Sequence, residues 1–74
     1  MAEIVLTDHA KYRLLERKID VHEAKKIAKN GRVTKTESDG TMIKVGLSSS
    51  GKLLEVVCRR EENNIIIKTA YYEN

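Results

Sequence analysis

Three residues near the start of the chain could act together in phosphate chemistry. His9, Arg13 and Arg17 recur at intervals of four positions, and on an α-helix this spacing places their side chains on one face. An imidazole there can serve as a general acid or base near neutral pH. The two guanidinium groups can hold a phosphate and stabilise charge that develops in a transition state. A solvated helix face, with its arginines paired to surface acids, explains the same spacing without any activity.

We call His9, Arg13 and Arg17 the basic stripe. Glu16 lies on the same predicted helix face. Its carboxylate offers either a base or an ion-pair partner for one of the arginines, and both roles stay open at this level.

The end of the chain holds a second group of candidate residues. In a strand over 65–72, period-two alternation puts Thr69 and Tyr71 on one face and Lys68 with Tyr72 on the other. A tyrosine can stack on a base or hydrogen-bond a phosphate. We therefore take Tyr71 as a candidate catalytic residue and Lys68 and Thr69 as candidate nucleic-acid contacts. Half-buried strand residues, which suit a pleated surface, are the alternative interpretation of these tyrosines.

Lysines on a second predicted helix are further candidates for contact with nucleic acid. Asp20 supplies a cap for a helix from Val21 to about Lys29. Its polar face carries Lys25 and Lys29, which an ordinary solvated surface explains equally well.

The elements that must position these residues can be predicted from periodicity and turn signals. Thr7 or Asp8 caps a helix that runs to about Arg17, and Asn30-Gly31 is typical of a left-handed helix end. Asp39-Gly40 indicates a hairpin. The predicted strands span 33–37, 41–48, 52–60 and 65–72, with a short edge strand over 4–6. This order predicts a single α+β domain over residues 1–74, with both helices packed on one face of a four-stranded antiparallel meander.

Composition narrows the classes of function and compartment. The chain has 74 residues, a formal charge of +3 and a sequence pI near 9.1, a mild bias compatible with nucleic acid. The only cysteine, Cys58, follows two valines and is expected to be a buried strand thiol, although a reactive nucleophile is the alternative. No run is long enough to span a membrane, and the start does not resemble a signal peptide. We expect a cytoplasmic protein without a metal or other cofactor, since no spacing of His and Cys resembles a metal site.

The order His9-Ala10-x-x-Arg13-x-x-x-Arg17-x-Ile19, closed by Thr69-Ala70-Tyr71, resembles a family of small prokaryotic and phage proteins of unknown function. That family is similar to BrnT-type toxins and, more remotely, to RelE/ParE-type toxins. The resemblance implies a RelE/BrnT-like fold and metal-independent cleavage of RNA, in which the ribose 2′-hydroxyl attacks the adjacent phosphate. It places the site on His9, Arg13, Arg17 and Tyr71.

These observations favour a small endoribonuclease-like domain that acts on RNA, with an antitoxin protein as a further partner that the resemblance implies. Two alternatives stay open. One is a non-catalytic module that binds nucleic acid, a protein or a second copy of itself through exposed strand edges and the Ile65-Ile66-Ile67 segment. The other is an inactive relative of a toxin.

Overall fold

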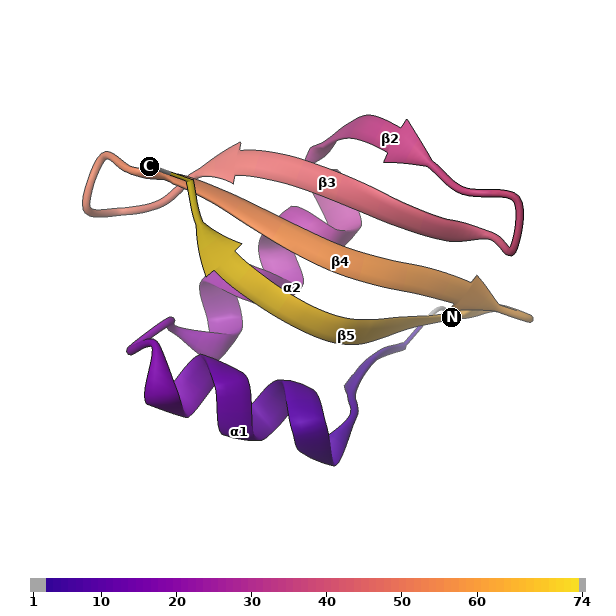
Figure 1. The fold of residues 1–74 in the computed structure, drawn as a ribbon, viewed down its shortest axis with the longest axis horizontal. Helices are drawn as coiled ribbons and strands as arrows, with labels where there is room; N and C mark the ends of the chain where they lie inside the picture. The colour runs from indigo at the N-terminus through magenta and orange to yellow at the C-terminus, as the bar shows by residue number, and fades with distance from the viewer. Residues whose placement is uncertain (1–2, 74) are drawn as a thin grey trace.

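The protein folds as two helices on one face of a five-stranded mixed sheet. The structure, a computed structural model, describes residues 3–73. The sheet order is β1-β5-β4-β3-β2, with β1 parallel to β5 and every other pair antiparallel (Figure 1). In chain order the elements are β1 (Ile4–Leu6), α1 (Asp8–Glu16), α2 (Val21–Asn30), β2 (Arg32–Thr36), β3 (Thr41–Leu47), β4 (Leu53–Glu61) and β5 (Asn64–Tyr72). The predicted α+β meander and its short N-terminal edge strand are confirmed.

Local signals in the sequence set the first residue of each helix. The Thr7 side chain accepts a hydrogen bond from the Ala10 N–H at 3.0 Å and begins α1, and Asp20 caps α2 in the same way. Helix α1 ends where Lys18 adopts a left-handed φ of 56°, which turns the chain back towards α2.

The predicted left-handed end of α2 is wrong. Gly31 has φ −68° and ψ 163°, an extended conformation that leads directly into β2. Glycine is needed there for space, because a Cβ at this position would lie 2.5 Å from the backbone oxygen of Ile27.

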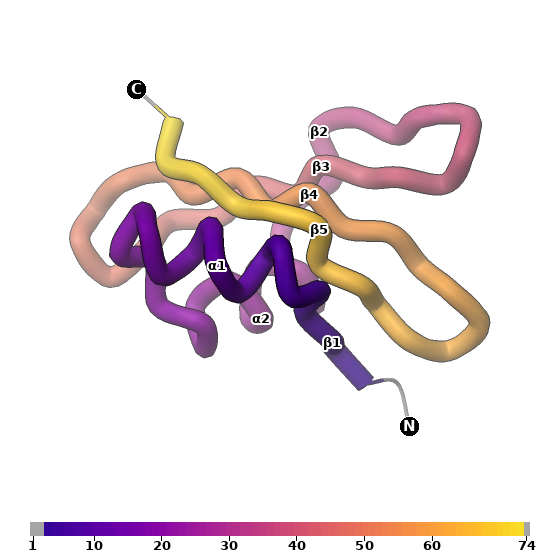
Figure 2. Tube along the Cα trace, turned by 60° about the horizontal axis from the view of Figure 1, so that its bottom comes forward, coloured from indigo at the N-terminus to yellow at the C-terminus, as the bar shows by residue number. Residues whose placement is uncertain are grey.

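The core lies between the helices and the sheet face that they cover, which we call the inner face. Leu14 of α1 and Leu54, Val56 and Ile67 of the sheet are fully buried there. In β3, Met42 packs against this core, and the Nζ of Lys44 donates to the Ala28 carbonyl of α2 at 2.7 Å. No helix covers the outer face of the sheet in the part of the chain that the structure describes (Figures 1 and 2).

A β-bulge in β5 corrects the predicted alternation of the last strand. Ile67 pairs with Cys58 and Thr69 pairs with Val57, so Lys68 is an extra residue without an opposite partner. Beyond it the side chains change face: Ala70 is buried on the inner face together with Ile67. Period-two counting through the whole strand from 65 to 72 is therefore wrong beyond Lys68, because it does not anticipate an inserted residue. Thr69 and Tyr71 still share one face, but it is the face opposite to that of Ile67.

Candidate functional site

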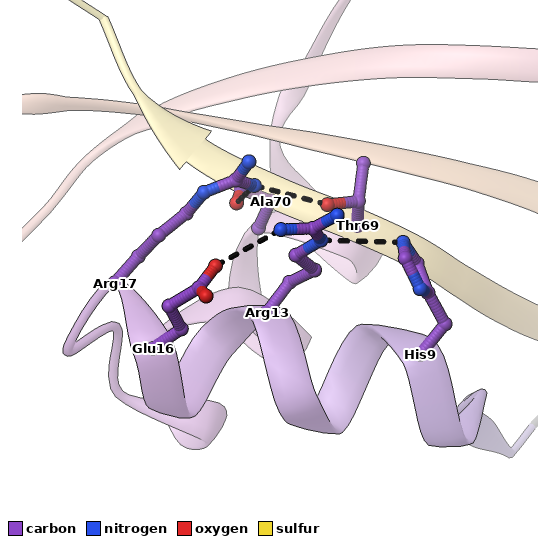
Figure 3. A network of polar contacts seen from close by, with 6 residues as sticks. All are labelled: His9, Arg13, Glu16, Arg17, Thr69 and Ala70. Atoms are coloured by element: carbon purple, nitrogen blue, oxygen red, sulfur yellow. Dashed lines mark hydrogen bonds and ion pairs between the residues drawn. The ribbon is translucent and has the colours of Figure 1, made fainter.

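The basic stripe lies along an edge of the sheet. Strand β1 pairs with β5 only from Ile65 to Ile67, so the remainder of β5 has no strand neighbour on that side within residues 3–73. Helix α1 occupies this space and runs beside β5 (Figure 2). Ala10 and Leu14 anchor its buried face with 0% exposure. Because His9, Arg13 and Arg17 lie on the adjoining flank of the helix, their side chains point towards the open part of β5 (Figure 3).

Arg17 joins α1 to the strand. Its Nη1 donates to the backbone oxygen of Ala70 at 2.9 Å and to Oγ1 of Thr69 at 3.2 Å (Figure 3). These contacts use one of the three guanidinium nitrogens, so the N–H groups of Nε and Nη2 stay available to a ligand. Strand β5 therefore holds the guanidinium group in place, and the N–H groups on its other two nitrogens can still bind a ligand.

Arg13 lies between His9 and Glu16 on the same helix. Its Nη1 pairs with Oε1 of Glu16 at 3.0 Å, and its Nε lies 3.4 Å from Nε2 of His9 (Figure 3). Of the two roles open to Glu16, the structure shows the ion pair. In the contact with His9, Nε of Arg13 donates and Nε2 of the imidazole accepts. At 3.4 Å this contact is longer than an ordinary N–H hydrogen bond, so an incoming anion can displace it at small cost.

The arrangement offers an anion two guanidinium groups and an imidazole side by side on an accessible surface. The side chains of Arg13 and Glu16 are 37% and 46% exposed. Guanidinium groups match the oxygens of a phosphate with paired N–H donors, and an imidazole next to them can accept or donate a proton. The chemistry that these groups support is binding of a phosphate and proton transfer beside it.

The remaining predicted site residues lie elsewhere. Thr69 is part of the site, through its contact with Arg17. Tyr71 is opposite Glu55 on the outer face of the sheet, and no hydrogen bond links it to the stripe among the described residues. Lys68 extends to Thr41, where its Nζ donates to Oγ1 at 3.2 Å.

The two helix lysines also stay apart from the stripe. Lys25 lines a groove with β1, and Lys29 is exposed in the last turn of α2. The structure therefore joins the two ends of the chain through Arg17, but Tyr71, Lys68, Lys25 and Lys29 do not converge with it.

Sequence reasoning missed the most direct partner in this site. The Ala70 acceptor is a backbone carbonyl, and no side-chain pattern marks a carbonyl that lacks a strand partner. Only the end of β1 after Leu6 leaves this oxygen for Arg17.

Cys58 is a core residue and not part of a site. It is fully buried on the inner face, and desolvation by burial raises the pKa of its thiol above the ordinary value of 9.0. The prediction of a buried strand thiol is confirmed. Within residues 3–73 the structure shows no cluster of three His, Cys, Asp or Glu side chains able to hold a metal ion, and no helix long and apolar enough to cross a membrane.

Comparison with known proteins gives a family and a fold. The family described as "Domain of unknown function (DUF4258)" matches residues 6–72. No curated protein matches the sequence. Among solved structures, the fold is similar to that of BrnT, the ribonuclease toxin of Brucella abortus, with a TM-score of 0.76 over 100% of this chain and 99% of that chain at 8% sequence identity. At that identity the likeness shows a BrnT-like fold.

Proposed function

We propose that this chain, which belongs to the DUF4258 family, binds single-stranded RNA through the basic stripe and cleaves it without a metal ion. The observation that carries the proposal is the position of the stripe: His9, Arg13 and Arg17 face the open edge of β5, and Arg17 is fixed there by Thr69 and Ala70. The BrnT-like fold adds support, because the similar protein is a ribonuclease toxin.

In this proposal the arginines hold the phosphate that is to be cleaved. The free N–H groups of Arg13 and Arg17 would bind its non-bridging oxygens and stabilise the charge that gathers on them in the transition state. Nε2 of His9 would accept the proton of the ribose 2′-hydroxyl. The 2′-oxygen then bonds to phosphorus, the bond to the 5′-oxygen breaks, and that oxygen takes a proton from water. The products are a 2′,3′-cyclic phosphate and a 5′-hydroxyl.

The test compares RNA cleavage by four proteins in the presence of a chelator. His9→Asn should lower the rate by a factor of about 10²–10⁴, the range expected for loss of a general acid or base. Arg13→Gln should lower both rate and affinity. Lys35→Gln is the matched control, because it removes the same charge from an exposed position on β2. Equal rates in all four proteins would remove the stripe from the mechanism.

The salt dependence of binding tests the phosphate contacts independently of cleavage. For single strands the logarithm of affinity falls with the logarithm of salt concentration by about 0.7 per neutralised phosphate. Arg13→Gln should therefore reduce this slope by about 0.7 if Arg13 contacts one phosphate. An unchanged slope would contradict that contact.

Binding without cleavage is the second candidate function, and one observation favours it. Glu16 is held in an ion pair with Arg13, and Tyr71 lies on the outer face, so the stripe has one proton-transferring group instead of an acid and a base. Salt-sensitive binding of RNA by the wild-type protein, with no product after long incubation, would establish this function in place of the first.

A further inference from the structure

A groove lies on the flank of α1 opposite to the basic stripe. It has a volume of about 350 Å³, at the lower end of the range for sites that take a ligand. It is lined by β1, one residue of α1 and the first half of α2: Ile4, Val5, Leu6, Lys11, Val21 and Lys25. The floor is therefore aliphatic, and the charged side chains in the lining are both lysines.

The two lysines give the lining of the groove a positive charge. Neither Lys11 nor Lys25 forms an ion pair within residues 3–73, and no acidic residue contributes to the lining. A carboxylate bound there would meet two uncompensated ammonium groups at the border of an apolar floor, where the local dielectric is lower than in water.

The groove also adjoins an unpaired backbone edge. Among residues 3–73, β1 is the outermost strand of the sheet and pairs only with β5. Val5 and Val21 are each 40% exposed beside it. An edge strand with open N–H and C=O groups can pair with an added strand, and alternate side chains of that strand can enter neighbouring pockets.

We propose that this groove binds an extended acidic and aliphatic segment of a partner protein, which adds to β1 as a further strand. Its aliphatic side chains cover Val5 and Val21, and its carboxylates pair with Lys11 and Lys25. Charge disfavours a second copy of this chain, because the other edge strand, β2, is basic and carries Arg32 and Lys35. RNA is disfavoured because no aromatic residue lines the groove for a base to stack on.

The probe is a blocked heptapeptide of alternating glutamate and valine, titrated into the isotopically labelled protein and followed by NMR. Saturable shifts are expected at the amides of Val5, Lys11 and Val21 and not at Lys35. A peptide with lysine in place of glutamate should bind at least fivefold more weakly. Two peptides methylated at alternate backbone nitrogens test the added strand. Binding should be abolished when the methylated nitrogens are those that face β1, and it should persist when they face away from β1. Equal binding of the acidic and basic peptides, or no binding, would overturn the proposal.

Two charge-reversed proteins complete the experiment. Lys11→Glu/Lys25→Glu should weaken binding of the acidic peptide at least tenfold. Lys26→Glu/Lys29→Glu makes the same change of net charge at exposed positions of α2 that do not line the groove, and it should change binding less than twofold. If the chemical shifts of the groove amides change with protein concentration in the absence of peptide, the groove binds a second copy of the chain. Equal shifts with inorganic phosphate would assign it to a small anion. Both results would overturn the proposal.

The groove and the stripe lie on opposite flanks of α1, so the two sites can be tested separately. The acidic peptide should leave the affinity of the protein for RNA unchanged. A failure of peptide binding leaves the RNA experiments unaffected, and an absence of RNA binding leaves the peptide titration interpretable.

Discussion

Replacing Arg17 with glutamine separates the structural role of the basic stripe from its role towards a ligand. Arginine and glutamine have similar helix propensities, so α1 itself should be preserved. The change removes two tertiary hydrogen bonds, at 2.9 Å to Ala70 and 3.2 Å to Thr69. Hydrogen bonds to charged groups contribute about 1.5–3 kcal/mol each when buried, but Arg17 is exposed and water can replace it at both acceptors. We therefore expect a loss of about 1–2 kcal/mol in the free energy of unfolding for the pair.

Arg13→Gln is the comparison, because it removes the same charge one turn away. Among the residues that the structure describes, the Arg13 side chain is bonded only within α1, to Glu16 and His9. An exposed ion pair of this spacing contributes about 0.2–0.5 kcal/mol. Arg17→Gln should therefore unfold at a clearly lower urea concentration than Arg13→Gln, and its melting temperature should fall by about 4–8 °C for each kcal/mol lost.

Urea unfolding followed by circular dichroism, with equal slopes in all variants, measures this difference. Thr69→Val removes the hydroxyl and keeps the branched shape, so a double-mutant cycle with Arg17→Gln isolates the contact between the two side chains. Equal urea midpoints for Arg13→Gln and Arg17→Gln, or a coupling energy of zero with Thr69→Val, would refute the idea that Arg17 joins α1 to β5.

Three further predictions concern the elements around the site. Lys18→Gly should stabilise the protein by about 0.5–1 kcal/mol, because a left-handed φ of 56° strains any residue with a Cβ; a lower urea midpoint would contradict this. Gly31→Ala should destabilise it by about 1–3 kcal/mol through the contact of the new Cβ with the Ile27 oxygen, whereas Asn30→Ala at the exposed neighbouring position should change the midpoint little. The pKa of the buried Cys58 thiol is raised in the folded state, so its contribution to stability is complete below pH 9.0, its ordinary pKa, and is lost as the pH rises through the folded value. Urea midpoints measured from pH 7 to 10.5 should therefore fall less for Cys58→Ala than for the wild type.

The helices were predictable because their signals are local. Thr7 and Asp20 supply cap oxygens within three residues of the N–H groups that they satisfy, and the buried residues Ala24, Ile27 and Ala28 recur with helical spacing.

The last strand was predictable only as far as its bulge. The residues of β5 carry no mark of the extra position at Lys68, which is defined by the pairing of Ile67 and Thr69 with successive residues of β4. Pairing is a property of two strands that are distant in sequence. The faces of Thr69, Ala70 and Tyr71 therefore required the tertiary structure, and with them the separation of Tyr71 from the basic stripe.

By itself the sequence determined that His9, Arg13 and Arg17 lie on one helix face, because four-residue spacing and the helix repeat are both local properties. It did not determine what that face meets. The structure decided this through the shortness of β1, which leaves the Ala70 carbonyl open and gives Arg17 a partner 53 positions away. A helix face is encoded by neighbouring residues, whereas a site also depends on which backbone groups the rest of the fold leaves unpaired.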